Sequence, residues 1–206
     1  MIRVGIIIGS TRPGRLGESV ARWVYDIAKT RNDAEYELID LLDYRLPHLD
    51  EPIPASAGKY SQEHTKAWAK KIASLDAFVF VTPEYNHSTS GALKNAIDFL
   101  YAEWGNKAAG FVSYGSAGGI RAVEHLRLIM AELQVADVRA QAWFSLFTDF
   151  ENFRAFRPDP SKEGSVRTML DQLVAWGNAL KTLRPSPPPV AVEAHRVAPS
   201  LATGAA

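Results

Sequence analysis

A short polar loop that follows the first apolar run of the chain has the residue types needed to bind a phosphate. Val4–Ile8 leads directly into Gly9-Ser10-Thr11-Arg12-Pro13-Gly14. Hydroxyl groups, free backbone N–H groups and the positive end of a helix all favour an anion. Arg12 and Arg15 add positive charge, and no carboxylate lies between Gly9 and Gly17. A phosphate at this loop would therefore meet hydrogen-bond donors and no repulsion.

The spacing within this loop excludes two nucleotide-binding motifs. Gly9-x4-Gly14 has the spacing of a Walker A motif, but Arg15-Leu16 stands where that motif needs Lys-Ser or Lys-Thr. The dinucleotide fingerprint G-x-G-x-x-G is also missing. The loop therefore suits one terminal phosphate better than a triphosphate or a pyrophosphate. The alternative is an ordinary helix start, with a serine or threonine cap and a turn proline.

Two further loops repeat the pattern of an apolar strand that leads into polar residues. Phe78–Val81 runs into Thr82 and then Pro83-Glu84-Tyr85-Asn86, whose rigid backbone, aromatic face and amide donors suit a flat heteroaromatic ring. Phe111–Ser113 runs into Tyr114 and then Gly115-Ser116-Ala117-Gly118-Gly119, where a ligand can approach bare backbone N–H groups. For both loops the alternative is a plain turn. The third loop is too short for the G-x-S-x-G elbow of serine hydrolases.

The elements that position these loops alternate regularly between strand and helix. This order predicts an α/β protein with a doubly wound, five-stranded parallel sheet of flavodoxin-like strand order 2-1-3-4-5 and helices on both faces. In such a sheet ligands bind at the carboxyl ends of the strands, so the three loops predict one composite site. The predicted strands are Arg3–Ile8, Glu35–Leu41, Ala77–Val81, Lys107–Ser113 and Val138–Trp143, and the predicted helices are Gly17–Thr30, Tyr60–Leu75, Ser90–Tyr101, Ile120–Leu133 and Ser165–Leu183.

The segments between and after these elements also give expectations. Tyr44–Gly58 contains three prolines and Leu146–Pro160 is aromatic, and both read as irregular connections. The apolar spacing of the last helix places Met169, Leu173, Trp176 and Leu180 on one core face, and core packing is also expected for Trp104 and Trp143. Residues 1–184 are expected to form one domain, and the Pro/Ala-rich residues 185–206 a disordered tail.

Composition narrows the function classes. The 206 residues include 23 Lys and Arg, 23 Asp and Glu, and no Cys, with 47% hydrophobic residues. Balanced charge gives no bulk attraction to nucleic acid or an anionic membrane, and no stretch reaches the ~20 apolar residues needed to span a bilayer. With no secretory signal and no disulfides, a cytoplasmic location is expected. The five histidines are scattered, so no metal site is expected, and redox chemistry would need a bound cofactor.

Four segments together resemble the NADPH-dependent FMN reductase family, which includes quinone, azo-dye and chromate reductases on a flavodoxin-like fold. They are Gly9-Ser10-Thr11-Arg12, Thr82-Pro83-Glu84-Tyr85-Asn86-His87-Ser88, Gly91-Ala92-Leu93-Lys94-Asn95-Ala96-Ile97-Asp98 and Gly118-Gly119. The similarity covers roughly Ile2–Leu183, and the second and third segments are its specific part. The resemblance implies non-covalent FMN, NAD(P)H as co-substrate and a homodimer or homotetramer.

The resemblance also assigns roles to residues. Ser10, Arg12, Leu16 and Gly17 match the phosphate-binding positions, and Thr11 and Arg15 of the same loop are also expected to bind the cofactor. Pro83, Glu84, Tyr85 and Asn86 are expected along the isoalloxazine ring, and Ser113, Tyr114, Gly115, Ser116, Ala117, Gly118 and Gly119 near its pyrimidine edge. Backbone N–H groups at Gly118 and Gly119 are expected to stabilise negative charge on the reduced ring. No catalytic side chain is expected.

The implied reaction passes a hydride from NAD(P)H to flavin N5, and the electrons then go to a small-molecule acceptor such as a quinone, an azo compound or a free flavin. Arg121 and Arg127 are candidates for contact with the 2′-phosphate of NADPH. One alternative is a flavodoxin-type electron carrier without enzymatic activity, although such carriers usually gain from a strongly charged face. A second alternative is a flavin-free binding or regulatory module on the same fold.

Overall fold

A twisted sheet of five parallel strands forms the centre of the protein in the computed structural model, which describes residues 1–184. The strand order is β2-β1-β3-β4-β5, and every neighbouring pair is parallel, as the sequence predicted. The predicted tail, residues 185–206, lies outside the described residues. The strands are β1 (Ile2–Ile8), β2 (Ala34–Asp40), β3 (Ala77–Pro83), β4 (Lys107–Gly115) and β5 (Val135–Ser145).

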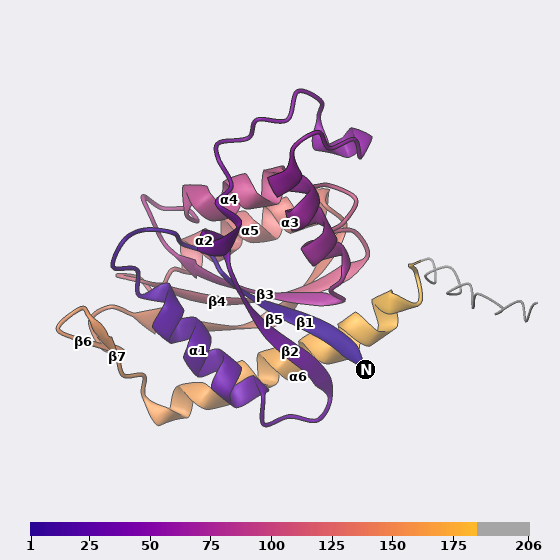
Figure 1. Ribbon diagram of the computed structural model, residues 1–206. Coiled ribbons are helices and arrows are strands. Elements are labelled where there is room, and N and C mark those ends of the chain that lie inside the picture. Colours follow the sequence, from indigo (N-terminus) through magenta and orange to yellow (C-terminus); the bar gives the residue numbers. More distant parts are fainter. Residues whose placement is uncertain (185–206) are drawn as a thin grey trace, which may run out of the picture.

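Helices cover both faces of this sheet, which gives three layers (Figure 1). α1 (Gly17–Ala28) and α6 (Glu163–Lys181) pack on one face. α3 (Glu63–Ala73), α4 (Gly91–Asp98) and α5 (Ile120–Glu132) pack on the other. Because helices connect the successive parallel strands of the sheet, the carboxyl ends of all five strands lie at the same edge of the sheet.

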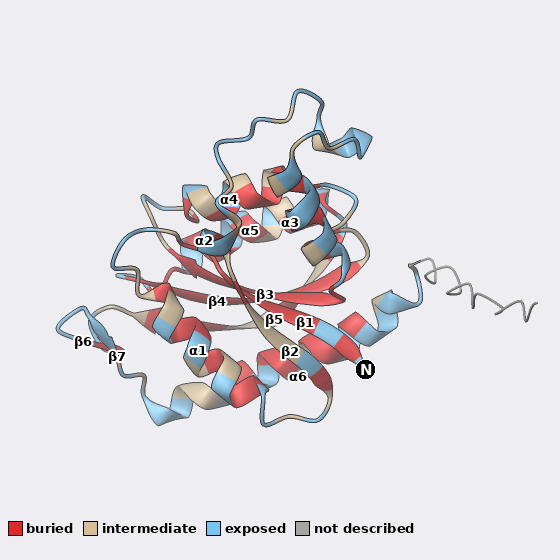
Figure 2. Ribbon diagram, viewed as in Figure 1, coloured by how far each residue is buried: buried red, intermediate tan, exposed pale blue. Residues whose placement is uncertain are grey.

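The apolar periodicity of the sequence explains the two cores, one on each face. β3 and β4 are buried along their whole length, as expected for central parallel strands covered on both faces. In Figure 2 the red of the buried residues accordingly follows the central strands and the helix faces turned toward them. The predicted core faces of the α1, α3 and α4 segments are confirmed, since every member is buried: Val20, Val24, Ile27, Ala28, Trp68, Ile72, Leu75, Leu93, Ile97 and Leu100.

The expected core face of the last helix was wrong at Trp176, which is 47% exposed. Gly177 takes the inward position instead, and a Cβ atom there would lie 2.8 Å from Cδ1 of Ile2. Because α6 approaches β1 this closely at Gly177, its neighbour Trp176 is turned to the flank of the helix.

The connections contain more structure than the sequence predicted. The predicted end of the second strand at Leu41 is instead the start of a short helix, α2 (Leu41–Tyr44), capped by the Asp40 side chain, which accepts a bond from the N–H of Leu42. A 3-10 turn, η1 (Ala55–Ala57), follows in the proline-rich connection, and η2 (Pro160–Lys162) precedes α6. The Leu146–Pro160 segment holds a small antiparallel hairpin, β6 (Phe150–Glu151) and β7 (Ala155–Phe156).

The hairpin is held by aromatic packing rather than by a long ladder. The Phe156 ring packs edge-on against Phe144 at 4.9 Å and against Trp23 at 5.7 Å, measured between ring centroids.

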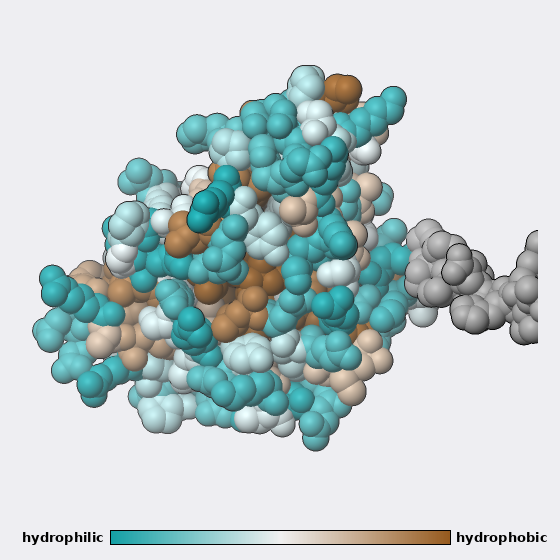
Figure 3. All heavy atoms as spheres, in the orientation of Figure 1, coloured by the Kyte–Doolittle hydropathy of each residue, from teal (hydrophilic) through white to brown (hydrophobic). Residues whose placement is uncertain are grey.

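Figure 3 shows a mainly hydrophilic surface on the side facing the reader, with apolar residues in smaller groups. Within residues 1–184, no helix is both long and apolar enough to cross a membrane.

Candidate functional site

The three loops predicted from the sequence lie side by side at the edge of the sheet formed by the carboxyl ends of the strands, called the carboxyl edge below. Ile8 at the end of β1 pairs with Val81 of β3, and Pro83 at the end of β3 pairs with Tyr114 of β4. The loops that follow these strands therefore start from adjacent positions. Two bonds tie them together: the Gly9 N–H donates to the Val81 carbonyl at 2.8 Å, and the Glu84 N–H donates to the Tyr114 carbonyl at 3.0 Å.

The first loop presents a hydroxyl group and a free guanidinium next to an uncapped helix. Ser10 is buried, and its hydroxyl lies 3.0 Å from the hydroxyl of Tyr85 on the second loop. The exposed Arg12 holds its guanidinium carbon 5.8 Å from the centre of the Tyr85 ring. Leu16 precedes α1, and no side chain among the described residues caps that helix. The simple alternative of a serine- or threonine-capped helix start is therefore wrong, and the positive end of α1 is left for a ligand.

Arg15 and Thr11 lie differently from Arg12. The Arg15 guanidinium pairs with Asp40 at the end of β2 and lies 3.8 Å from Glu18. Its positive charge is thus already matched within the protein, which the local sequence could not show because Asp40 comes from another strand. Thr11 borders a separate cavity of about 240 Å³ together with Asn95 of α4.

Tyr114 of β4 packs against the start of α1, next to the first loop. It is 5% exposed, and its hydroxyl has no hydrogen-bond partner within the described chain. A Cβ atom on Gly17 would lie 2.7 Å from this hydroxyl oxygen, so only glycine fits where α1 begins. Burial raises the pKa of Tyr114 well above its ordinary value, and the nearby Tyr85 hydroxyl adds to this effect. The group therefore stays a neutral hydrogen-bond donor beneath the loop.

The second loop is a tight two-residue turn. The Tyr85 N–H donates to the Ser88 carbonyl at 2.9 Å, and the Ser88 N–H donates to the Tyr85 carbonyl at 3.1 Å. Between them Asn86 has φ +48° and His87 has φ +74°, a left-handed pair that matches a type I′ turn. Asn86 and His87 are exposed at its tip. Such backbone in a non-glycine residue costs free energy, so the surrounding structure must hold the turn in place.

Buried hydroxyl groups that the sequence analysis did not single out hold this turn. The hydroxyls of Thr82 and Thr89 lie 2.8 Å apart on the two sides of the turn. Ser90 caps α4 by accepting a bond from the Leu93 N–H at 3.0 Å, and its own hydroxyl donates to the carbonyl of Gly9 on the first loop. The one sequence signal for this was Ser90 directly before a helix, a typical cap position.

Glu84 points into the protein, and Arg121 of α5 pairs with it. The Arg121 Nε lies 2.6 Å from Oε1 of Glu84, whereas Oε2 of Glu84 is buried with no partner within residues 1–184. Arg121 therefore holds the second loop against α5. Arg127, the other candidate for the 2′-phosphate of NADPH, pairs with Asp137 of β5 instead.

The third loop is shaped by two consecutive glycines in left-handed backbone. Gly118 and Gly119 both have φ +72°, and a Cβ on Gly119 would lie 2.8 Å from the backbone nitrogen of Tyr114. The buried Ser113 donates its hydroxyl to the Gly118 carbonyl at 2.7 Å, so it braces the loop. Ser116 and Ala117 are exposed, whereas Gly115 is buried.

The hydrogen bonds of this loop change one expectation. The Gly118 N–H already donates to the Gly115 carbonyl at 3.1 Å. Of the two expected donors only Gly119, which precedes α5 without any side-chain cap, remains a candidate. The uncapped start of α5 is a second positive helix end at the same edge of the sheet.

The two tryptophans considered for the core behave differently. Trp104 is fully buried, as predicted, whereas Trp143 is 43% exposed and its core assignment was wrong. Trp143 lies near the end of the edge strand β5, where no further strand covers it. Its ring packs on Gly118, where a Cβ would come within 2.7 Å, and the Lys162 Nζ lies 3.7 Å from the ring centre.

Comparison with known proteins decides the family. The family model described as NADPH-dependent FMN reductase matches residues 2–149. The chain belongs to the NADPH-dependent FMN reductase family. This confirms the resemblance, and with it an oxidoreductase that works with FMN and NAD(P)H. The matched residues contain all three loops of the site.

Alignments with relatives in this family cover most of this chain and most of each relative. An NAD(P)H-dependent FMN reductase of Nectria sp is 39% identical over 72% of this chain and 79% of its own. An NAD(P)H:quinone oxidoreductase of Solanum tuberosum is 34% identical over 70% and 75%. Among solved structures, a flavoenzyme NAD(P)H:(acceptor) oxidoreductase from Paracoccus denitrificans superimposes with a TM-score of 0.66 over 87% of this chain and 98% of its own, at 22% identity, which supports the fold.

The residues at the carboxyl edge fit FMN in this member of the family. Two helices, α1 and α5, begin there without a side-chain cap, and Arg12 supplies a cation without a carboxylate partner within residues 1–184. The Tyr114 hydroxyl and the Oε2 atom of Glu84 are buried without a partner in the part of the chain that the structure describes. The donor set suits a phosphate and a polar ring rather than a metal, and no cluster of potential metal ligands occurs in the described part of the chain.

Proposed function

We propose that the chain is an FMN-containing reductase in which NAD(P)H and a small electron acceptor use the site at the carboxyl edge in turn. The acceptor classes we propose are quinones, azo compounds and free flavins. The observation that carries the proposal is the meeting of three loops with two uncapped helix starts at one edge of the sheet. The names of the relatives, a quinone oxidoreductase and FMN-dependent azoreductases, support these acceptor classes.

The first loop would hold the phosphate. Arg12 and the Ser10 hydroxyl would bind phosphate oxygens, with Thr11 and the backbone of Leu16 and Gly17 at the start of α1. A phosphate there gains from the positive end of the helix and from a charge-assisted bond to Arg12. Arg15 would contribute indirectly, because its pair with Asp40 fixes the path of the chain between the loop and α1.

The second and third loops would hold the ring. The backbone and side chains of Pro83, Glu84, Tyr85 and Asn86 would line one side of the ring. The third loop, Gly115-Ser116-Ala117-Gly118-Gly119, would lie at its polar edge above Ser113 and Tyr114. The glycines allow this approach, because their backbone carries no side chain that would hold a ring away.

The bound FMN supplies the ability to take up a hydride and pass electrons on, which no side chain of this protein can do. The chain binds and orients that group and the two substrates. The uncapped start of α5 and the N–H of Gly119 stabilise negative charge at the polar edge of the ring. We assign no acid or base to a side chain, because water and the substrates can supply the protons at an exposed site.

The proposal distinguishes an enzyme from an electron carrier. An enzyme oxidises NADPH rapidly when only a simple quinone is added to the purified protein with FMN. A flavodoxin-type carrier turns over only when a separate reductase is supplied. The measurement is NADPH consumption with menadione, with and without such a reductase. Turnover that depends on the added reductase would contradict the proposal.

We also propose, from the resemblance alone, that the enzyme is a homodimer or homotetramer in the cytoplasm. Light scattering on the purified protein tests the assembly, and a monomer as the main species would contradict it. Cell fractionation tests the compartment.

A further inference from the structure

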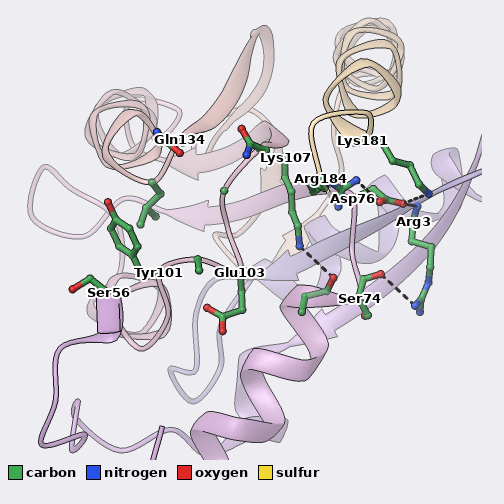
Figure 4. Close-up of a pocket in the computed structure, with 15 residues that line it drawn as sticks. Arg3, Ser56, Ser74, Asp76, Tyr101, Glu103, Lys107, Gln134, Lys181 and Arg184 are labelled. Atoms are coloured by element: carbon green, nitrogen blue, oxygen red, sulfur yellow. Dashed lines mark hydrogen bonds and ion pairs between the residues drawn. The ribbon is translucent and has the colours of Figure 1, made fainter. Parts of the chain in front are cut away.

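A second cavity lies at the opposite edge of the sheet, where the strands begin. Its volume is about 900 Å³. It is bordered by Asp76, just before β3, by Lys107, the first residue of β4, and by Gln134, just before β5, with Arg184 at the end of the described chain (Figure 4). The three loops of the candidate site follow the far ends of the strands, so this cavity is separate from them.

Lys107 is the buried amine of this cavity. The residue is only 3% exposed. Its Nζ donates to the Ile72 carbonyl at 2.7 Å and reaches the Ala73 carbonyl at 3.5 Å, both in the last turn of α3. Within residues 1–184 no carboxylate lies within ion-pair distance of this nitrogen. A buried lysine without a carboxylate partner is unusual, since burial penalises its charged form.

The surroundings make this amine easy to deprotonate. Burial, together with a smaller effect of the positive charge of Arg184, lowers the pKa of Lys107 from 10.5 to about 7, although Asp76 and Glu103 oppose the change. A substantial fraction of Lys107 therefore carries a free lone pair at neutral pH. Lysines activated for attack on carbonyl carbon are produced in the same way, by desolvation and a neighbouring cation.

Two cations that border the same cavity, Lys181 and Arg184, give it a preference for anions. Asp76 accepts bonds from Lys181 at 3.1 Å and from Arg184 at 2.5 Å, so two cations share one carboxylate. Nε of Arg184 is buried and has no partner within the described chain. Glu103, on the other side, already accepts a bond from the Tyr60 hydroxyl at 2.8 Å. Lys181 and Arg184 therefore retain positive charge for a ligand.

We propose that Lys107 is a reactive amine that condenses with an aldehyde or ketone carrying a phosphate or carboxylate group, bound in this second cavity. The Lys107 nitrogen attacks the carbonyl carbon and forms the C–N bond. One proton from the amine and one from solvent move to the oxygen, the C–O bond breaks and the oxygen leaves as water, which gives a protonated imine. The protonated imine keeps one N–H, which remains bonded to the Ile72 carbonyl. Lys181 and Arg184 bind the anionic group.

The test is trapping with pyridoxal 5′-phosphate and sodium cyanoborohydride, followed by mass spectrometry of the peptides. Lys94 is the internal reference, because it is half-exposed on α4 and paired with Asp98 at 2.6 Å. We expect Lys107 to be labelled at least tenfold faster than Lys94 near pH 7, with a rate that rises through a midpoint near the pKa of about 7. Pyridoxal, which lacks the phosphate, should label Lys107 at least tenfold more slowly.

Two variants separate the parts of the proposal. Lys107→Met keeps an unbranched side chain of nearly the same length and should remove this label while leaving FMN binding unchanged. Lys181→Gln should slow labelling by pyridoxal 5′-phosphate and leave labelling by pyridoxal unaffected. Labelling of native Lys107 that is no faster than that of Lys94, or that appears only after unfolding in urea, would overturn the proposal. Equal labelling by pyridoxal 5′-phosphate and pyridoxal would overturn the claim that Lys181 and Arg184 bind an anionic group of the ligand. Mapping on the unmutated protein decides the matter even if Lys107→Met does not fold.

Discussion

Arg12 is the residue on which phosphate binding at the first loop depends most. Ser10 and the start of α1 supply neutral donors, whereas Arg12 supplies the charge that Arg15, paired with Asp40, does not. We expect Arg12→Ala to weaken FMN binding by about tenfold to a hundredfold, the loss of one charge-assisted hydrogen bond. Turnover of the fully loaded enzyme should change much less. Titration of FMN against protein fluorescence measures the first effect, and saturating FMN in the assay measures the second.

The matched control for this prediction is Arg22→Ala on α1, the helix that follows the first loop. Arg22 is 64% exposed and, among residues 1–184, pairs only with Glu18, one turn earlier, at 2.9 Å. It should leave FMN affinity unchanged. Equal FMN affinity in the Arg12 variant and the parent protein would show that the phosphate does not bind at this loop.

The sequence pattern predicted where the three loops lie, but it could not show which of their side chains already pair or pack within the protein. The pair between Arg15 and Asp40 joins the first loop to the end of β2, so no local pattern reveals it. Tyr114 was chosen with its loop because of its place in the sequence, yet its ring points into the core beneath α1. Trp143 was expected to be buried because it is large and aromatic, but it lies on an edge strand. Ion-pair partners from other strands and the position of a strand at the edge of the sheet become visible only once the sheet is assembled.

The third loop depends on the backbone that its glycines allow. Gly119→Ala should destabilise the protein by about 1–3 kcal/mol, because alanine avoids the left-handed region and its Cβ would lie 2.8 Å from the Tyr114 nitrogen. It should also weaken FMN binding, since the start of α5 would shift. Urea unfolding measures the first effect and FMN titration the second.

Gly164→Ala on α6 is the control for that substitution. A Cβ there meets no atom within 4 Å, so the change in the free energy of unfolding should stay within about 0.5 kcal/mol. If both alanine variants were as stable as the parent protein, the left-handed backbone at Gly119 would not matter to the loop.

Segments with strong apolar periodicity were predicted as strands and helices. Where the periodicity is weak, the bounds of β5 and the β6–β7 hairpin were not predicted. β3 is a continuous apolar run and was expected where it lies, although it continues two residues further to Pro83. β5 is longer than expected, Val135–Ser145, because an edge strand alternates polar and apolar residues and its pairing with β4 shifts register near Gly110. The β6–β7 hairpin depends on distant aromatic contacts with Phe144 and Trp23, which its own sequence does not signal.

The stability of the whole molecule should depend on pH through Lys107. The pKa of this amine is about 7 in the folded protein, mainly because of burial, against an ordinary value of 10.5. The unfolded chain therefore binds more protons between these two values, so the free energy of unfolding rises with pH across that window. Relative to Lys107→Met, the parent protein should gain roughly 2 kcal/mol between pH 7 and pH 9.

Urea unfolding of both proteins at the two pH values measures this gain. The comparison with the methionine variant removes the contributions of all other titrating groups. A difference between the two proteins that does not change with pH would show that Lys107 stays charged in the folded state.

The visible absorbance spectrum of the purified protein, recorded before and after NADPH is added without oxygen, tests the central claim most directly. The account predicts a yellow protein, or one that becomes yellow and retains FMN through desalting, whose flavin absorbance bleaches when NADPH is added and returns when a quinone follows. A protein that stays colourless after incubation with FMN, or a bound flavin that NADPH does not bleach, would contradict it.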